Sequence, residues 1–511
     1  MECIASLDQG TQSTRLLLYD AEAQLIDSHH MEFTQITPQP GWVEHDPMEI
    51  WDSVLQCIEK GLSQARSRHP ELKVTGLGIT NQRETTMAWD RTTGQPLHNA
   101  IVWMDRRTAA ICQRLSKELG SGDAFRETTG LPISTYFSAF KWLWLLENVE
   151  AVQQAAAEGR CMVGTMDTWL MYNLTGGAHG GIFVTDVSNA ARTCLMDIKN
   201  LQWAPDLLQR FRLSTDMLPR ICSNAEIYGH VRDGPLTGVP IAGCLGDQHA
   251  ALLGQRCRPL EAKNTYGTGC FLLLHTGTEP VPSQAGLLTT MAYQLGPEEP
   301  PQYALEGSIA IAGAGVSWLR DRLGLIDSVD ECEAVASSVP DTGGVFFVPA
   351  FSGLLAPHWR SDARGVILGL SSYSGKAHIV RALLEAITWQ TKEVLQAMLK
   401  DAKQPNFKLL RVDGGASRNN LLMQLQADAI QIPVRRPEHL ETTSLGAAFA
   451  AGIATGFWTK EWVLGSTSEE KRHGDYTDFL PKVDPATIEK RFRCWEKAVE
   501  RSFDLEDFDA E

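Results

Sequence analysis

Asp247 is a candidate general base because of the residues that surround it. It stands in Gly246-Asp247-Gln248-His249, and the small and apolar residues 250–254 follow directly. A carboxylate at this place could simply cap the helix that the pattern predicts. It could also accept the proton of a hydroxyl that attacks phosphorus, while positioning and charge neutralisation supply most of the remaining catalysis. Helix capping and base catalysis therefore both stay open for Asp247.

Two hydroxyl-rich loops could hold phosphate groups. The first runs from Asp8 to Thr14, between apolar strands predicted at 3–7 and 15–19. The second, Tyr266-Gly267-Thr268-Gly269, also separates two predicted strands. Tight turns leave backbone N–H groups free, and hydroxyls can donate to phosphate at short range. Each loop alone could be a plain tight turn, but their recurrence suggests two related halves.

A third polar cluster follows a predicted buried strand at 74–80. It reads Asn81-Gln82-Arg83-Glu84. Ligand sites in α/β sheets favour the carboxyl ends of strands, so this cluster is a candidate binding site. The alternative for Arg83 and Glu84 is a surface ion pair. No P-loop and no dinucleotide-binding glycine motif is present, so any nucleotide site must be of another kind.

The second half of the chain shows how such loops could be positioned. Apolar residues at helical spacing predict a long helix at 377–400. A strand at 409–412 runs into Asp413-Gly414-Gly415, and a helix is predicted at 419–430. Residues 444–452 are small and predict a closely packed helix with Thr442 or Thr443 as cap. Strands, glycine turns and helices in this order are typical of α/β layers.

Composition excludes several classes of function. The 511 residues are 43% hydrophobic and 21% charged, as in an ordinary globular protein of several domains. A net charge of −16 argues against binding to nucleic acid or to an anionic membrane. The 11 cysteines form no C-x-x-C pair, and no signal peptide or membrane span is visible. We therefore expect a cytoplasmic protein without a membrane anchor, as the acidic residues at 503–511 also indicate.

Taken together, these motifs resemble those of the FGGY family of carbohydrate kinases, and the resemblance covers nearly the whole chain. Within that family the chain is most similar to the branch that phosphorylates glycerol. The segments that carry the resemblance are Asp8-Gln9-Gly10-Thr11, Gly41-Trp42-Val43-Glu44-His45-Asp46-Pro47, Asn81-Gln82-Arg83-Glu84-Thr85-Thr86, Val102-Trp103, Gly246-Asp247-Gln248, Asn264 to Phe271, and Val412-Asp413-Gly414-Gly415. Both family signatures also fit, one beginning at Tyr136 and the other running from Gly365 to Glu385.

The resemblance implies an actin/hexokinase-like (ribonuclease H-like) α/β fold with a central ligand cleft. It implies an N-terminal domain at 1–252 for polyol and phosphate binding and a C-terminal domain at 253–511 for nucleotide binding. ATP and Mg²⁺ would be the cofactors, glycerol the substrate and glycerol 3-phosphate the product, in a protein that forms a homo-oligomer.

The resemblance also assigns roles to residues. Asp247 would be the base, and it would bind magnesium together with Asp8. The residues around the polyol would be Arg83, Glu84, Trp103, Tyr136, Asp247, Gln248 and Phe271. The residues around the nucleotide would be Thr11, Gln12, Ser13, Arg15, Gly267, Thr268, Gly313, Ser317, Gly415 and Asn419. A polyol has almost no apolar surface, so a pocket of directed donors and acceptors suits it.

Four positions depart from the family pattern. Gln12 stands where many relatives have a small hydroxyl residue, and Ser317 stands where some have a longer amide. Ala139 replaces a glycine that is common in the first signature, and His358 replaces a frequent tyrosine. Two other functions stay open as alternatives. One is a kinase of the same family that acts on a ketose or a longer polyol. The other is a catalytically silent regulatory protein of the same fold.

Overall fold

Strand β1 (Glu2–Gln9) lies inside a six-stranded sheet in the first half of the chain. The computed structural model describes residues 1–351, 353–465 and 476–505. In this sheet the order is β13 (Gly229–His230), β14 (Pro240–Gly246), β5 (Lys73–Asn81), β1, β2 (Ser13–Tyr19) and β3 (Leu25–Glu32). β1 runs antiparallel to β2 and parallel to β5. The predicted hairpin is confirmed, with strands that extend further into the loop than expected.

A second sheet repeats this arrangement in the other half. Its order is β17 (Leu288–Tyr293), β18 (Gln302–Ile309), β16 (Cys270–Gly277), β15 (Ala262–Tyr266), β21 (Leu410–Asp413), β22 (Val434–Pro437) and β23 (Tyr476–Phe479). β15 pairs antiparallel with β16, which follows it in the chain, and parallel with β21. β1 pairs with β2 and β5 in the same way. The two related halves that the recurring loops suggested are therefore present in the topology.

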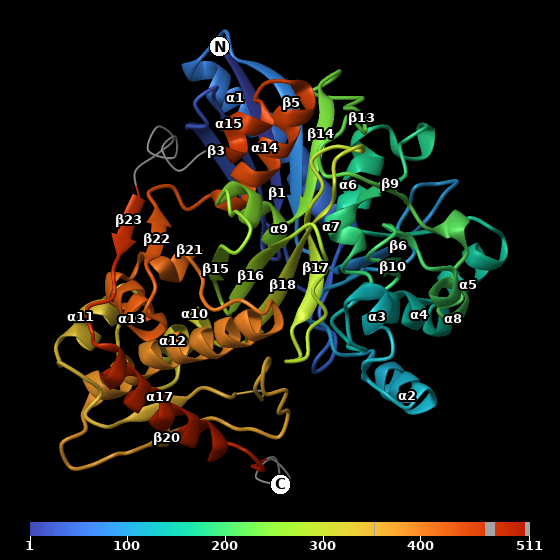
Figure 1. Ribbon diagram of the computed structural model, residues 1–511. Helices are drawn as coiled ribbons and strands as arrows, with labels where there is room; N and C mark the ends of the chain where they lie inside the picture. Colours follow the sequence, from blue (N-terminus) through green and yellow to red (C-terminus); the bar gives the residue numbers. More distant parts are fainter. Residues whose placement is uncertain (352, 466–475, 506–511) are drawn as a thin grey trace.

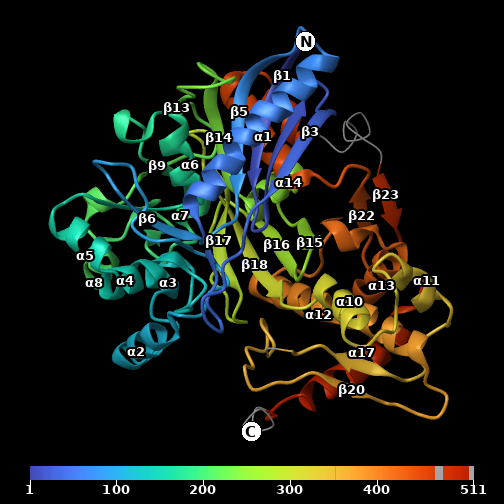
Figure 2. The ribbon, with the colours of Figure 1, turned by 180° about the vertical axis from the view of Figure 1, so that it is seen from behind.

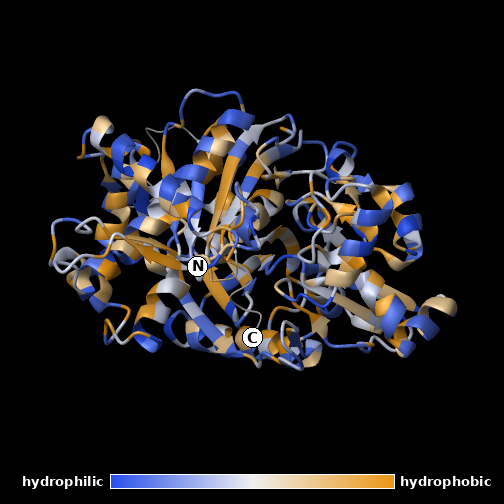
Figure 3. Ribbon diagram, turned by 90° about the horizontal axis from the view of Figure 1, so that it is seen from below, coloured by the Kyte–Doolittle hydropathy of each residue, from blue (hydrophilic) through white to orange (hydrophobic). Residues whose placement is uncertain are grey.

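The predicted long helices cover the sheets. α1 (Pro47–Arg68) packs on the first sheet, and α12 (Lys376–Asp401) packs on the second. α13 (Asn420–Ile430) follows β21 as predicted, and α17 (Pro485–Glu500) buries Trp495 completely. Figure 3 shows hydrophobic strands in the interior and helices of mixed character around them. The amphipathic patterns read from the sequence are thus the faces that close the cores.

Helices α9 (Asp247–Gly254) and α14 (Thr442–Thr455) cross at very short range. A Cβ added at Gly446 would lie 1.8 Å from the carbonyl oxygen of Ala250, and one at Gly254 would lie 1.9 Å from that of Thr442. α14 also lies against the strands of the first sheet, although it comes from the far end of the chain (Figures 1 and 2). Small residues are needed here because helix backbones touch. The predicted threonine cap is wrong: Glu441 precedes the helix, and the Thr442 hydroxyl donates to Asp413.

The remaining elements form a side lobe on the first half and the edges of the second. The lobe contains a four-stranded sheet of β4 (Glu44–His45), β7 (Ala100–Ile101), β6 (Thr86–Asp90) and β8 (Cys161–Thr165). Its short strands are β9 (Val184–Asp186), β10 (Met196–Asp197), β11 (Gln202–Trp203) and β12 (Arg220–Cys222), and the second half adds β19 (Phe346–Val348) and β20 (Val366–Leu368). The other α-helices are α2 (Ala109–Leu119), α3 (Arg126–Thr129), α4 (Ser138–Asn148), α5 (Glu150–Ala157), α6 (Met166–Leu174), α7 (Val187–Ala190), α8 (Pro205–Arg210), α10 (Gly313–Asp321), α11 (Glu331–Ser337) and α15 (Lys460–Leu464). The 3₁₀ turns are Gly177–His179, Thr215–Met217 and Gly415–Arg418.

In the ranges that the structure describes, no helix combines the length and the apolar character needed to cross a bilayer. The acidic end of the tail, residues 506–511, lies outside the described residues.

Candidate active site

Asp247 is the first residue of α9, at the carboxyl end of β14. Gly246 takes the N-cap position, so Asp247 is not the N-cap residue of the helix. Its Oδ1 accepts a hydrogen bond from the Gln248 amide at 2.7 Å and lies 3.1 Å from Arg83 Nε. The side chain is 31% exposed. The N-cap role that the sequence left open for Asp247 is thus taken by Gly246, and its role as a base stays a prediction.

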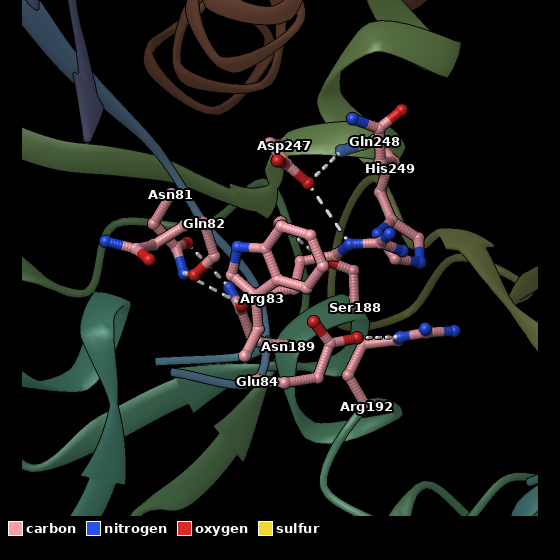
Figure 4. A network of polar contacts seen from close by, with 12 residues as sticks. Asn81, Gln82, Arg83, Glu84, Ser188, Asn189, Arg192, Asp247, Gln248 and His249 are labelled. Carbon is pink, nitrogen blue, oxygen red and sulfur yellow. Dashed lines mark hydrogen bonds and ion pairs between the residues drawn. The ribbon is translucent and has the colours of Figure 1, made fainter. Parts of the chain in front are cut away.

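Arg83 is the centre of a buried ion cluster that joins the two halves. Its Nη1 and Nη2 donate to the two carboxylate oxygens of Glu306 at 2.7 and 2.9 Å. Arg192 Nε donates to Glu84 Oε1 at 2.5 Å, and Arg192 Nη1 donates to Glu306 at 3.3 Å. Figure 4 shows Arg83 between Asp247 and the Glu84–Arg192 pair. The surface ion pair considered for Arg83 and Glu84 is wrong, because both are buried and each pairs with another residue.

Glu84 adopts an unusual backbone conformation. Its φ is 60°, in the left-handed region that non-glycine residues seldom occupy. Beside it, Asn81 and Asn189 exchange hydrogen bonds between their side-chain amides at 2.9 and 3.0 Å. Asn189 is held in turn by Asp186, the N-cap of α7. These contacts fix the end of β5, so the strained turn is supported from the side of α7 (Figure 4).

Charge and burial shift several pKa values in this cluster. The arginines Arg192 and Arg83 hold the pKa of Glu306 down at about 2 despite its complete burial. Burial raises the pKa of Glu84 above its ordinary value, although the Arg192 guanidinium opposes the change. Tyr136 lies in the same field, and burial raises its pKa above the ordinary value. Glu306 is therefore the firmly ionised partner of the two arginines.

Three aromatic rings line one side of the site. The Trp103 ring centroid lies 5.7 Å from that of Tyr136 and 6.2 Å from that of Phe271. Trp103 Nε1 donates to Thr11 Oγ1 at 3.0 Å. Phe271 comes from β16 of the second half, whereas Trp103, Tyr136 and Thr11 come from the first. The structure thus brings the predicted polyol residues together and connects them to the first phosphate loop.

Gln248 is oriented by a lysine from the second half. Lys263 is fully buried on β15, and its Nζ donates to Gln248 Oε1 and, at 2.9 Å, to Thr265 Oγ1. Burial lowers the pKa of Lys263 to about 8. Since the amide oxygen faces the ammonium group, the Gln248 Nε2 donor is turned away from it.

The first loop is a tight turn at the end of β1. The Gly10 amide donates to the Ser13 carbonyl at 2.9 Å, and Thr11 and Gln12 form the tip. Arg15 Nη1 lies 3.0 Å from Glu441 in a half-exposed ion pair, so its predicted phosphate contact would require it to share or leave that partner. Asp8, at the end of β1, is buried, and we find no hydrogen bond or ion pair to its carboxylate among the described residues. Burial raises its pKa to about 7, and the nearby carboxylates add to the effect.

The second loop packs against the start of α10. The Gly313 amide donates to the Gly267 carbonyl at 3.0 Å, and the amides of Ala312 and Ala314 donate to the Thr268 carbonyl. Gly414 has φ 83°, and a Cβ there would lie 2.5 Å from the Tyr266 carbonyl oxygen, which brings Gly415 beside this loop. Ser317 lies further along α10, and Asn419 caps α13 by accepting from the Leu422 amide. No described contact links these last two to the phosphate loops.

Sequence reasoning missed Glu306, Arg192 and Lys263. Each is a charged residue inside a stretch that otherwise looks like buried core, for example Tyr303-Ala304-Leu305-Glu306-Gly307. A charge at a core position is the signal that could have found them, because such a charge needs a partner. Which partner it has is set by pairing between distant strands and could not be read locally.

Comparisons with known proteins agree with this geometry. Residues 3–254 match the N-terminal domain of the FGGY family of carbohydrate kinases, and residues 262–455 match the C-terminal domain. A glycerol kinase of Arabidopsis thaliana is 54% identical over 515 residues, covering 99% of this chain and 98% of that protein. A glycerol kinase of Roseiflexus sp. is 50% identical over 505 residues, covering 99% of each.

Solved structures show the same fold. The crystal structure of Plasmodium falciparum glycerol kinase with ADP superposes with a TM-score of 0.92 at 41% identity, covering 98% of both chains. A xylulose kinase from Lactobacillus acidophilus has a TM-score of 0.83 at 22% identity, covering 98% of both chains, a likeness of fold alone. The two equivalent sheets and these matches define a two-domain carbohydrate kinase fold. The chain belongs to the FGGY family of carbohydrate kinases.

Proposed function

We propose that this protein is an ATP-dependent glycerol kinase. It would transfer the γ-phosphoryl group of ATP to a terminal hydroxyl of glycerol and release glycerol 3-phosphate and ADP. Support comes from relatives named glycerol kinase that are 50–54% identical over nearly the whole chain, one from Arabidopsis thaliana and one from Roseiflexus sp.. An ADP-bound structure of such a relative supports the use of a nucleotide. The observation in this chain that carries the proposal is the contact between Asp247 and Arg83 beside the aromatic side formed by Trp103.

In the proposed reaction, Asp247 accepts the proton of the attacking hydroxyl. Its Oδ1 is engaged by Arg83 and by the Gln248 amide, whereas Oδ2 has no partner among the described residues. The glycerol oxygen forms a bond to the γ-phosphorus as the bond between that phosphorus and the ADP oxygen breaks. The proton passes to the Asp247 carboxylate, and the electron pair of the broken bond stays on ADP. Arg83 Nε, 3.1 Å from Oδ1, holds the carboxylate so that Oδ2 is left for the attacking hydroxyl.

The same side chains suit the three hydroxyls of glycerol. Arg83 and Gln248 Nε2 offer donors, and the Glu84 oxygen that Arg192 does not occupy offers an acceptor. Trp103 and Phe271 would cover the carbon chain. A buried polar group left without a partner costs about 1–3 kcal/mol, so substrates that lack a hydroxyl should be rejected.

Asp8 fits a role in holding Mg²⁺. A buried carboxylate without a hydrogen bond, with its pKa raised to about 7, is an uncompensated group that a hard cation would satisfy. Asp247 would be a second ligand, because its Oδ2 also has no partner in the part of the chain that the structure describes. When bound, Mg²⁺ would neutralise negative charge on the ATP phosphates. The two glycine loops, with Thr11, Ser13 and Thr268, would supply hydroxyl and backbone donors to the same phosphates.

We further propose that residues 1–252 bind polyol and phosphate and that residues 253–511 bind the nucleotide, with Gly313, Ser317, Gly415 and Asn419 on the adenosine side. Phe271 extends the polyol site into the second half. A homo-oligomer in the cytoplasm stays part of the proposal.

The first test measures ADP release in magnesium buffer with glycerol, xylulose, ribulose or no acceptor, for the wild type and Asp247→Asn. We expect release that depends on glycerol and collapses in the variant. Stimulation by a ketose but not by glycerol would contradict the substrate and favour a ketose kinase. If no acceptor stimulates the wild type, a catalytically silent protein of this fold becomes the better interpretation.

A further inference from the structure

Glu306 is a charged residue of the second half that reaches into the site of the first. It lies on β18, between the neighbouring strands β16 and β17, with 0% of its surface exposed. Its carboxylate receives three hydrogen bonds, two from Arg83 and one from Arg192. Both of its carboxylate oxygens are engaged by these guanidinium groups. Its effect must therefore pass through the arginines.

The donors of Arg83 show what that effect is. A guanidinium has five N–H donors in one plane. Glu306 takes one from Nη1 and one from Nη2, and Nε faces Asp247 Oδ1 at 3.1 Å. Two N–H groups are then left for a substrate. Because a two-point contact fixes the plane of the guanidinium, the directions of Nε and of the two remaining donors are fixed with it.

Glu306 also sets the acceptor side of the site. Arg192, which shares the Glu306 carboxylate, donates to Glu84 Oε1 through Nε. Glu306 thus contacts both arginines, and these contact the base Asp247 and the predicted acceptor Glu84. One carboxylate from the second half therefore contacts both the Arg83–Asp247 pair and the Arg192–Glu84 pair.

We propose that Glu306 is a positioning residue for phosphoryl transfer: it fixes the guanidinium planes of Arg83 and Arg192 across the two halves, so that Asp247 and Glu84 face the acceptor in register. This inference rests on the proposed kinase function and assigns the geometry of that site to a residue outside it. The competing explanation is that Glu306 only neutralises two buried arginines and contributes to folding alone.

Two substitutions separate these explanations. Glu306→Gln keeps the size of the side chain but puts an NH₂ group where a carboxylate oxygen accepted, so the two-point contact with Arg83 is lost. Glu306→Asp keeps the charge for both arginines but is too short to reach both Nη atoms in the same way. Glu261→Gln is the matched control, since Glu261 is also a buried carboxylate of the second half, 3.1 Å from Arg411 Nε. It directly precedes β15, whereas the Gly267 loop follows that strand.

The measurements are steady-state kinetics with each substrate varied in turn, and calorimetric binding of glycerol without nucleotide. For Glu306→Gln we expect the KM and Kd for glycerol to rise about tenfold or more, kcat to fall by a similar factor, and the KM for ATP to stay within about twofold. Glu306→Asp should lie between this variant and the wild type. Glu261→Gln should change none of these values by more than about twofold.

A purely structural role predicts a different result. Glu306→Gln would then lower the unfolding temperature while the folded fraction binds glycerol as the wild type does, and that result would overturn the inference. If Glu306→Gln does not fold, glycerol binding is compared between Glu306→Asp and the wild type instead. Glu306→Asp keeps the negative charge beside both arginines, so unchanged binding in this variant would also overturn the inference. If the wild type prefers another acceptor, the same comparison is made with that acceptor. If the wild type releases no ADP with any acceptor, the proposed function fails first and this inference falls with it.

Discussion

Replacing Lys263 by methionine should make stability less dependent on pH. Lys263 is fully buried, and its ammonium group is held by Gln248 and Thr265, which are both neutral. Burial disfavours the charged form and lowers the pKa of Lys263 from 10.5 to about 8. A lysine whose folded-state pKa is depressed destabilises the folded protein at low pH. That cost is fully present below the folded-state pKa and disappears as pH rises through the unfolded-state value.

The size of this cost follows from the shift. A difference of about 2.5 pKa units corresponds to about 3 kcal/mol at neutral pH, and only about 1 kcal/mol is left near pH 9.5. From about pH 7 to about pH 9.5, the wild type should therefore gain about 2 kcal/mol of unfolding free energy relative to Lys263→Met. The variant also loses the hydrogen bond to Gln248, which destabilises it by about 1–3 kcal/mol. This loss opposes the gain from removing the buried charge, but it does not change with pH.

Urea unfolding of both proteins at the two pH values tests this reasoning. A difference that is the same at both values would refute it, since it would mean that Lys263 is not a buried charge in the folded protein. The same variant should also bind glycerol more weakly, because the Gln248 amide is no longer oriented.

Three further outcomes follow from contacts elsewhere in the site. Gly446→Ala should lower the unfolding free energy by about 1–3 kcal/mol or more in urea, because the new Cβ meets the backbone of α9, whereas Gly122→Ala, with nothing within 4 Å, should stay near wild type. Trp103→Phe removes the hydrogen bond that Trp103 Nε1 donates to Thr11 at 3.0 Å. Because such a bond is worth about 0.5–1.5 kcal/mol, the KM for ATP or glycerol, measured from initial rates, should rise by up to about tenfold. Asp8→Asn should abolish the rise in melting temperature that Mg²⁺ with nucleotide gives the wild type, as read in a thermal titration; an equal rise in both proteins would speak against Asp8 as a ligand.

The sequence predicts the local parts of this molecule well. Both hairpins, the long helix α12 and the strand–glycine turn–helix unit after β21 follow from periodicity and turn chemistry, which act over a few residues. The motif residues Arg83, Glu84 and Asp247 could also be named, and the structure brings them together. What these residues contact was beyond local reasoning, because Glu306 comes from β18 and Arg192 from the turn after α7.

The small residues of α14 also show that local structure could be predicted and tertiary contacts could not. A run of small residues at 444–452 predicts close packing, but not that the neighbour is α9. The expected threonine cap failed for a related reason. Thr442 is drawn into the helix and donates to Asp413 on β21, a tertiary contact that replaces the local one.

The contacts around α9 connect the proposed base to the nucleotide side. Asp247 begins α9, and α9 crosses α14 with backbone against backbone. α14 begins at Thr442, whose hydroxyl donates to Asp413, and Asp413 immediately precedes the glycine turn of Gly414. Because two helices that touch through glycines cannot slide without a clash, α9 and α14 should move as one body. Any closure of the two halves must then be taken up in the loops around them, and Glu306 is placed to hold Arg83 in line with Asp247 while that closure occurs.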